Sequence, residues 1–373
     1  MDSFFASVEL LKYPDLKGWP VVVGGRSAHQ PEPMPDGTRR YARLRDYVGR
    51  GVVTTSTYEA RALGVFSGMP TMKCAKLAPD AILLPANFND YRHYSRAFKA
   101  AVATVAPHIQ DRGIDEIYID LTHEAGETRE LAQRIKDAVV GATGLSCSIC
   151  IAPNRLLAKI GSDLEKPNGL TILSAADVPL RIWPLAASKV NGIGPKAAEK
   201  LRLLGITTIG ELAAADAGLL QEHFGRSYSA WLLNVAHGID HSEVVTHSEP
   251  KSMSRETTFE KDFHPRHDRN FLGEVFTNLC VRVSEDLLRK RYVGKTVGIK
   301  LRFHDFQTVT RDITLVKPTC DAAEIRRAAS ECLKRVTLDK RIRLLGVKIS
   351  ALTVAEVEPR PEPRQGDLFA EGN

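Results

Sequence analysis

Strand-like and helix-like patterns of apolar and polar residues follow one another through the first 170 positions. Short apolar runs closed by glycine or proline predict buried strands, at residues 20–25, 52–55, 81–85, 114–121 and 146–151. Helix-like segments lie between them, at residues 4–10, 58–61, 91–105, 128–140 and 153–164. This order of elements predicts an α/β or α+β arrangement in which helices cover a sheet.

The pattern changes after residue 170. Residues 171–240 are mostly helical, and residues 244–250 are polar and extended, as in a linker. The remainder predicts a small α+β domain, with helices at 269–290 and 322–336 and strands at 295–303, 307–315 and 344–353.

Two segments lack such a pattern. Residues 26–50 are rich in Pro, Gly and Arg and predict an exposed loop or a short basic excursion. The end of the chain, from residue 356, is charged and rich in proline, which predicts disorder.

Composition narrows the class of protein. The chain has 373 residues, of which 43% are hydrophobic and 26% charged, as in a soluble protein of several domains. No apolar run approaches the roughly 20 residues that cross a bilayer, and Met1-Asp2-Ser3 does not open a signal peptide. We therefore expect a cytoplasmic protein without a membrane partner. A net charge of +6 is compatible with a polyanionic partner without demonstrating one.

The six cysteines include one CxxC pair, Cys147 and Cys150, inside an apolar strand pattern. A structural zinc site needs about four ligands, and no second CxxC or HxxxH completes one. We expect these cysteines to lie in the core.

Candidate chemistry centres on Asp115 and Glu116, which follow Gly113 and stand among isoleucines. Neighbours on a regular strand point to opposite faces, so the two carboxylates share a site only if the backbone bends there, which Gly113 allows. Negative charge at a buried sheet edge is costly without cations, and magnesium prefers carboxylate and phosphate oxygens. The alternative is an ordinary solvated acidic turn.

Five short motifs resemble, in order and spacing, those of Y-family DNA polymerases. They are Asp2-Ser-Phe-Phe-Ala-Ser-Val-Glu9, Thr57-Tyr-Glu-Ala-Arg61, Ile114-Asp-Glu116, Ala152-Pro-Asn-Arg-Leu-Leu-Ala-Lys159 and Lys166-Pro-Asn-Gly169. The resemblance implies a multi-domain α+β right-hand fold of palm, fingers and helical thumb, followed by a little-finger domain. It further implies an error-prone translesion polymerase of DNA repair that lacks proofreading.

The resemblance also assigns roles. Asp115 and Glu116 match the catalytic carboxylates that hold two Mg²⁺ ions for nucleotidyl transfer. Tyr58 and Arg61, which share a helix face, and Lys159 match contacts to the triphosphate of the incoming deoxynucleotide. Phe5 matches the steric gate that excludes a 2′-hydroxyl, whereas core packing is the alternative for Phe4 and Phe5.

One family feature is missing. A further metal-binding aspartate is expected two residues before Asp2, at the end of an initial palm strand, and neither is in this sequence. A start upstream of Met1 is one explanation, and a family member with impaired synthesis that still binds DNA and the sliding clamp is the other. We favour the first because the other catalytic motifs are intact.

Later segments predict partners. Gly192 and Gly194 lie in a pattern that resembles a helix-hairpin-helix motif, which binds DNA phosphates through backbone N–H groups. Lys300 and Arg302 alternate with apolar residues on a strand and predict a basic face toward DNA. Gln365, Leu368 and Phe369 resemble a peptide that binds the sliding clamp. A repair nuclease or glycosylase would instead need another acid or lysine constellation near residues 192–212, and none is present.

The predicted organisation is a catalytic core at 1–194, with the palm at 1–9 and 81–170 and the fingers at 10–80. The thumb is predicted at 171–240, the linker at 241–250, the little finger at 251–355 and the clamp-binding tail at 356–373. We expect a monomer that binds primer-template DNA and deoxynucleoside triphosphates.

Overall fold

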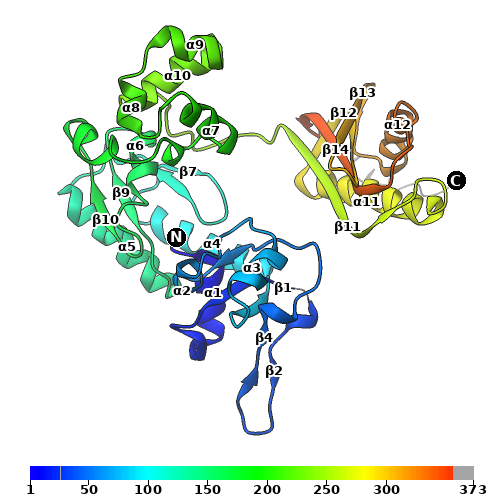
Figure 1. Cartoon of the computed structure of the whole chain (residues 1–373), viewed down its shortest axis with the longest axis horizontal. Coiled ribbons are helices and arrows are strands. Elements are labelled where there is room, and N and C mark those ends of the chain that lie inside the picture. Colours follow the sequence, from blue (N-terminus) through cyan, green and yellow to red (C-terminus); the bar gives the residue numbers. More distant parts are fainter. Residues whose placement is uncertain (26, 356–373) are drawn as a thin grey trace, which may run out of the picture. The chain divides into compact units, whose positions relative to one another are not determined.

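The computed structural model describes residues 1–25 and 27–355 of the chain. The residues fall into two compact units, Met1–His247 and the part that begins at Ser248 (Figure 1). Each unit has cores of its own. The α+β class expected from the sequence is confirmed in both.

A four-stranded sheet organises the first part of unit 1. Its strands run in the order β4 (Ala42–Arg43), β6 (Ile82–Pro85), β1 (Val21–Gly25) and β5 (Thr55–Ser56). β1 is parallel to β6 and antiparallel to β5. Helices α2 (Tyr58–Ala62) and α3 (Thr71–Leu77) follow β5. The strand expected at 52–55 is observed as β5, which begins only at Thr55. Val52 lies outside it and forms an isolated bridge with Pro70.

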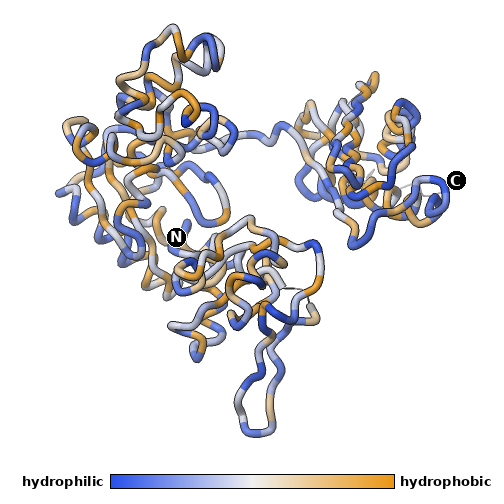
Figure 2. The backbone as a smooth tube through the Cα atoms, in the orientation of Figure 1, coloured by the Kyte–Doolittle hydropathy of each residue, from blue (hydrophilic) through white to orange (hydrophobic). Residues whose placement is uncertain are grey.

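The segment 26–50 is only partly the exposed loop expected from the sequence. Strands β2 (Glu32–Pro33) and β3 (Arg39–Arg40) form an exposed hairpin, which projects from the sheet in Figure 1 and is mainly hydrophilic in Figure 2. The prediction was wrong for the following residues. Leu44 and Tyr47 are buried in the core and β4 pairs with β6, because two apolar residues outweigh the surrounding arginines.

Helices and two strand pairs form the next part of unit 1. The helices are α1 (Phe4–Lys12), α4 (Phe88–Ala103), α5 (Thr128–Thr143) and α6 (Arg155–Gly161). The strand pairs are the hairpin β7 (Ile109–Asp111) with β8 (Ile117–Ile119), and the parallel pair β9 (Ile149–Ile151) with β10 (Leu170–Ile172). Both β8 and β9 are shorter than the predicted strands, so the acidic pair lies outside regular strand.

The last part of unit 1 is helical. It contains α7 (Pro195–Leu203), α8 (Ile209–Ala213), α9 (Ala217–Phe224) and α10 (Arg226–Ala236). Their core is built on leucines and isoleucines that are fully buried, among them Leu201, Ile209, Leu212, Leu220 and Leu232.

Unit 2 is an antiparallel sheet covered on one face by two helices. The strands are β11 (Ser252–Phe263), β12 (Tyr292–Phe303), β13 (Thr308–Thr319) and β14 (Ile342–Val354), in the order β11-β14-β12-β13. Helices α11 (Arg269–Lys290) and α12 (Ala322–Lys334) share a core with Val297, Ile299 and Leu301 of β12. Because strand residues alternate between faces, Lys300 and Arg302 lie on the face that the helices leave open.

Cys147 is buried and Cys150 is half-buried, and both thiols are free. Burial raises the pKa of Cys147, and it raises the pKa of Cys150 to about 12. These thiols pack as core residues, as the sequence predicted.

Candidate functional site

The acidic pair sits at the tip of the hairpin between β7 and β8. Lys99 fixes the start of the tip, since its Nζ donates to Oδ2 of Asp111 and to the carbonyl of Gly113, each at 2.7 Å. The N–H of Arg112 donates to the carbonyl of Glu116 at 3.1 Å. The backbone therefore leaves the strand at residues 113–115, as two adjacent carboxylates serving one site require.

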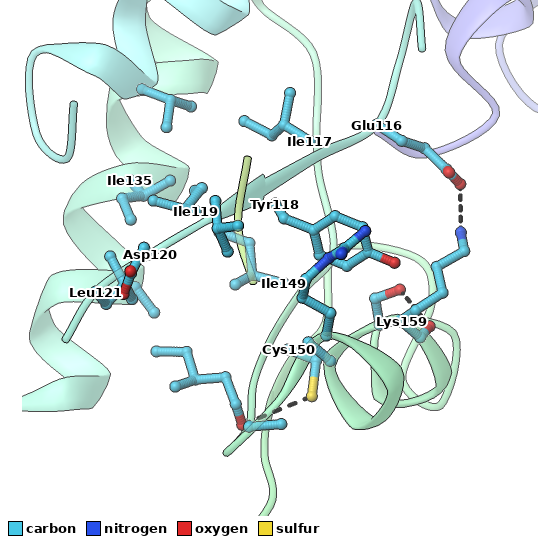
Figure 3. A pocket seen from close by; sticks show the side chains of 18 of the residues that line it. Glu116, Ile117, Tyr118, Ile119, Asp120, Leu121, Ile135, Ile149, Cys150 and Lys159 are labelled. Carbon is cyan, nitrogen blue, oxygen red and sulfur yellow. Dashed lines mark hydrogen bonds and ion pairs between the residues drawn. The ribbon is translucent and has the colours of Figure 1, made fainter. Parts of the chain in front are cut away.

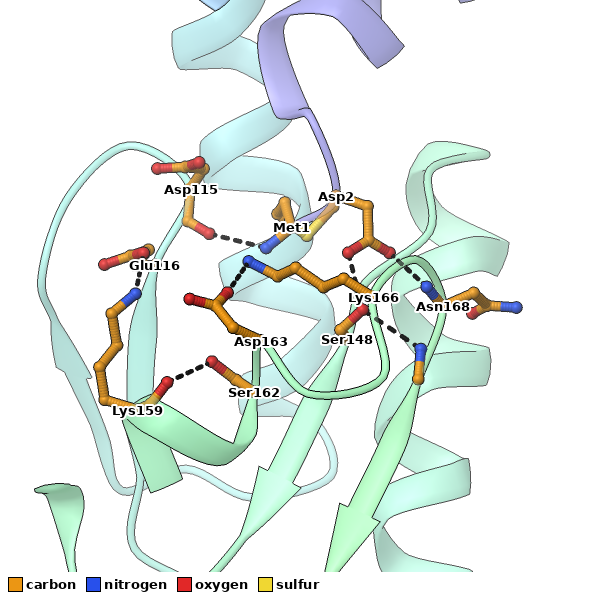
Figure 4. Close-up of polar contacts among 11 residues, drawn as sticks. Met1, Asp2, Asp115, Glu116, Ser148, Lys159, Ser162, Asp163, Lys166 and Asn168 are labelled. Carbon is orange, nitrogen blue, oxygen red and sulfur yellow. Dashed lines mark hydrogen bonds and ion pairs between the residues drawn. The ribbon is translucent and has the colours of Figure 1, made fainter. Parts of the chain in front are cut away.

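A lysine from another element reaches this tip. Lys159, in the last turn of α6, forms an ion pair with Glu116 (Figure 4). The Glu116 side chain stays 46% exposed, so the pair can open toward a ligand. Within the described part of the chain, no side chain bonds the carboxylate of Asp115, which leaves its oxygens available.

Asp2 serves another purpose. It is 2% exposed and accepts hydrogen bonds from Ser148 Oγ at 2.7 Å, Ser146 Oγ at 3.0 Å and the N–H of Asn168 at 2.9 Å. These bonds tie the residues before α1 to the segment that leads into β9 and to the turn that holds Lys166. Asp2 is thus committed to the scaffold and does not take the place of the expected metal-binding aspartate.

Tyr58 and Arg61 gather beside a second lysine. The Arg61 guanidinium lies 4.9 Å from the centroid of the Tyr58 ring. Burial raises the pKa of Tyr58, and the charges of Arg61 and Lys166 act on its hydroxyl in the opposite direction. The buried Tyr58 Oη has no hydrogen-bond partner among residues 1–25 and 27–355. A donor that has no partner among the described residues and feels the charges of two cations fits an anionic ligand.

Lys166 connects this group to the acidic pair. Its Nζ bonds Asp163 Oδ1 at 2.6 Å. Burial opposes its charge, but Asp163, Tyr58 and Asp2 raise the pKa of Lys166 above its ordinary value. Lys166 also lines a cavity with Asp115, Glu116 and Lys159, and Figure 4 shows Glu116, Lys159, Asp163 and Lys166 converging on one region.

The cavity has a volume of about 870 Å³, and polar and apolar residues contribute about equally to its lining. Ile117 and Ile119 of β8, Ile149 of β9 and Ile135 of α5 line it (Figure 3). It therefore runs from the charged tip into the space between two separate strand pairs.

The two adjacent phenylalanines, Phe4 and Phe5, differ in burial. Phe4 is 2% exposed and packs edge-on against Phe98 in the core. Phe5 is only partly buried, and its ring lies 4.5 Å from that of Tyr91. Phe5 is the one of the pair that remains accessible to a ligand.

The carboxylates of Asp115 and Glu116 fit magnesium if a bound substrate supplies further oxygen ligands. In the described ranges no three His, Cys, Asp or Glu side chains cluster closely enough to hold a metal ion. Magnesium commonly takes one or two carboxylates and completes its six oxygens with water and substrate phosphates. Asp115 and Glu116 fit that mode of binding, in which the nucleotide supplies part of the shell.

Gly192 and Gly194 precede α7, and they differ in their surroundings. Gly192 has φ +114°, and a Cβ there would lie 2.7 Å from the Trp231 ring, so the position requires glycine. Gly194 caps α7 and has open space around it. Pro195, the first residue of α7, has no N–H, so Lys196 offers the first N–H group of this helix to an anion.

The open face of the unit 2 sheet carries paired charges. Lys300 bonds Glu256 at 2.8 Å, and Arg302 donates to Thr308 Oγ1 at 2.9 Å. Lys348 lies 3.6 Å from Asp312. The predicted basic residues are therefore on one face, but acidic neighbours offset part of their charge.

Sequence reasoning assigned no role to Lys166, Asp163 or Ser148. The sequence feature that could have pointed to Lys166 as a site residue was its position at the start of the Lys-Pro-Asn-Gly motif. Its proximity to Tyr58 arises from folding and could not be read from spacing. Gln365, Leu368 and Phe369 lie outside the described residues.

In the part of the chain that the structure describes, no helix combines the length and apolar character needed to cross a bilayer.

Comparisons with known proteins cover almost the whole chain. A model described as the impB/mucB/samB family matches residues 1–163, and the model of that family's C-terminal domain matches residues 250–368. DNA polymerase IV of Methanoculleus marisnigri is 39% identical over 355 residues, covering 94% of this chain and 92% of that protein. DNA polymerase IV 1 of Bacillus subtilis is 36% identical over 374 residues, covering 99% and 84%.

Solved structures agree in fold. A Y-family DNA polymerase chimera superposes with a TM-score of 0.78 at 25% identity, covering 95% of this chain and 97% of the chimera. The insertion ternary complex of the Dbh DNA polymerase gives a TM-score of 0.61 at 25% identity, covering 95% and 98%.

Proposed function

The chain belongs to the Y family of DNA polymerases, the translesion enzymes that include DNA polymerase IV, and on this premise we propose that it transfers nucleotides to a primer at the hairpin tip of Asp115 and Glu116. One observation carries the proposal: Lys166 lines the same cavity as Asp115 and Glu116, and its charge also acts on the Tyr58 hydroxyl, for which the described residues offer no hydrogen-bond partner.

The acidic pair holds the metal in this proposal. Members of the family typically use divalent metals, and we assign two Mg²⁺ ions to Asp115 and Glu116 together with triphosphate oxygens. When bound, magnesium supplies charge neutralisation at the phosphates and a lower pKa for the primer 3′-hydroxyl. The chain's own part is to hold both carboxylates at a clamped hairpin tip.

The cations and Tyr58 hold the triphosphate. Tyr58 Oη, for which the described residues offer no partner, donates a hydrogen bond to the triphosphate, and Arg61 provides a planar guanidinium for phosphate oxygens. Lys159 leaves Glu116 for a phosphate as the nucleotide enters. Lys166 is a further phosphate contact, because it already acts on Tyr58. These groups orient the α-phosphate toward the primer and carry most of the catalysis by positioning.

Phe5 discriminates the sugar. Its partly buried ring lies under the sugar and leaves no room for a 2′-hydroxyl, so ribonucleotides are rejected.

Primer-template DNA is held at sites that contact the phosphate backbone. The N-terminus of α7 behind Gly192 and Gly194 offers N–H groups to a phosphate. Lys300 and Arg302 offer charge on the open face of the unit 2 sheet. Such contacts are independent of sequence, as an enzyme that moves along DNA requires. We expect a cytoplasmic monomer.

For the domains we propose the boundaries that the sequence predicts. Residues 1–194 form the core, with the palm at 1–9 and 81–170 and the fingers at 10–80. The thumb, at 171–240, and the little finger, at 251–355, hold the duplex.

Primer extension with Mg²⁺ tests the site. Asp115→Ala should lower the rate at least a hundredfold, since the loss of a metal ligand removes charge stabilisation at the reacting phosphate (on the order of 10²–10³ for one such group). Asp137→Ala, on the exposed face of α5, is the matched control and should keep the parent rate. Extension by Asp115→Ala at the parent rate would discard the site assignment.

A second candidate is a family member that binds DNA and the clamp but synthesises poorly. It is favoured by the lack, among the described residues, of a third metal-binding side chain beside the acidic pair. Tight primer-template binding without extension at saturating nucleotide and Mg²⁺ would support it. Recovery of synthesis in a form extended upstream by a strand ending in aspartate would support the first candidate instead.

The sliding clamp is the proposed protein partner. Leu368 and Phe369 would enter an apolar pocket of the clamp, and Gln365 would fix their orientation. Deleting residues 365–369 should abolish the stimulation of synthesis by the clamp, because the tether no longer raises the local enzyme concentration. Synthesis without the clamp should stay at the parent rate. Unchanged stimulation in the deletion variant would remove this partner.

A further inference from the structure

Two helices bring three side chains, Glu9, Phe88 and Tyr91, together with Phe5. Phe5 and Glu9 are four residues apart on α1, and Phe88 and Tyr91 are three apart on α4. Side chains at these spacings share a helix face. Since α1 packs against α4, the two pairs meet.

Aromatic rings set the position of Phe5. Tyr91 is its nearest ring, with centroids 4.5 Å apart and planes at 30°. Phe88 meets Phe5 edge-on at 5.8 Å and is itself 5.6 Å from Tyr91. Tyr91 is therefore the floor on which the Phe5 ring rests.

Tyr91 in turn is held by a buried acid. Its hydroxyl donates to Glu9 Oε1 at 2.5 Å, and the two side chains are 0% and 4% exposed. The backbone of Asn87 and the charge of Lys12 lower the pKa of Glu9, whereas the charge of Asp90 raises it. Burial raises the pKa of Glu9, and the bond from Tyr91 opposes that rise.

A buried carboxyl group is costly unless its oxygens are bonded. Glu9 is not among the residues that we assign to the transfer reaction, and its carboxylate accepts a hydrogen bond from Tyr91. The bond restrains the Tyr91 hydroxyl, and the contacts with Phe5 and Phe88 set the tilt of its ring. A small shift of that ring would move Phe5 toward or away from a bound sugar.

We propose that Glu9 and Tyr91 are positioning residues that hold Phe5 in place and thereby set how strictly deoxyribonucleotides are chosen over ribonucleotides. The inference rests on the proposed function, in which Phe5 is the sugar gate. It extends sugar selection from one ring to a chain of three side chains on two helices.

The test is the ratio of kcat/KM for a deoxynucleotide to that for the matching ribonucleotide. Tyr91→Phe and Glu9→Leu should each lower this ratio about tenfold, the low end of what a change in pocket shape gives. Glu9→Gln keeps an oxygen that accepts from Tyr91 and should stay near the parent ratio. The change should arise from faster ribonucleotide insertion, whereas mere damage to the fold would slow both substrates.

Tyr41→Phe is the matched control. Tyr41 also donates to a carboxylate, Asp15 Oδ2 at 2.7 Å, but its ring contact is Tyr13 and not Phe5. Its removal should leave the ratio unchanged.

Phe5→Ala distinguishes the proposed sugar gate at Phe5 from the proposed positioning role of Glu9 and Tyr91. It should lower the ratio by itself, and adding Tyr91→Phe to it should cause no further change. If Phe5→Ala lowers the ratio but folded Tyr91→Phe and Glu9→Leu do not, the positioning role is overturned while the gate stands. If Phe5→Ala has no effect, the gate fails and the inference fails with it. Should Glu9→Leu not fold, Tyr91→Phe alone decides the outcome.

Discussion

At the scale of single residues, the site is marked by a hydroxyl without a partner. Tyr58 Oη is buried, and no group in the described residues bonds it. A buried donor without an acceptor costs about 1–3 kcal/mol, so the free protein carries this cost. Binding of a phosphate oxygen would remove it, which links the unpaired hydroxyl to nucleotide affinity.

Tyr58→Phe should therefore have opposite effects on stability and binding. The melting temperature of the free protein should rise, because the unpaired hydroxyl is gone and about 1 kcal/mol or more is recovered. KM for the incoming nucleotide should rise by about three- to tenfold, the value of one lost hydrogen bond. Thermal unfolding and single-nucleotide insertion measure the two quantities. A lower KM would contradict the proposed contact.

At the scale of elements, local hydrogen bonds fix the start of α8 in the helical part of unit 1. The side chain of Glu211 accepts from the N–H groups of Thr207 and Thr208, at 2.7 and 2.9 Å, and Thr208 Oγ1 accepts from the N–H of Glu211 at 3.1 Å. This is a capping box. It orders the segment that follows the hairpin of Gly192 and Gly194.

The same bonds predict a pH dependence. The backbone N–H of Thr207, its hydroxyl and the N–H of Thr208 lower the pKa of Glu211 to about 2, from an ordinary value of 4.5. A lowered pKa stabilises the fold above pH 4.5, and that stabilisation is lost as the pH falls through about 2. The parent should therefore be more stable than Glu211→Gln at pH 6, and the difference should shrink at lower pH. Chemical denaturation at several pH values measures it, and a difference that grows with acid would refute the bond network.

At the scale of the whole molecule, two units with separate cores should unfold separately. Leu301 and Leu201 are both 0% exposed, the first in the core of unit 2 and the second in a core of unit 1. Truncation of a buried leucine to alanine costs about 2–5 kcal/mol. The effect should be confined to the unit that contains the cavity.

Leu301→Ala should lower the midpoint temperature of the calorimetric transition of unit 2. Leu201→Ala should lower the midpoint temperature of the transition of unit 1. Each variant is the control for the other. A single transition that shifts equally in both variants would show that the two units unfold as one.

The sequence by itself determined the elements whose periodicity is long and the motifs whose chemistry is local. Helix α11 spans the predicted residues 269–290, because its apolar spacing repeats over many turns. Membership of the Y family of DNA polymerases could also be predicted from the sequence, because five motifs keep the order and spacing of that family.

Only the tertiary structure decided which distant residues meet. It paired Glu116 with Lys159, placed Lys166 beside Tyr58, and committed Asp2 to the scaffold. It also buried Leu44 in a segment whose arginines predicted exposure. The physical reason is that local patterns report the face a residue prefers, whereas contacts across 40 or more residues depend on how whole elements pack.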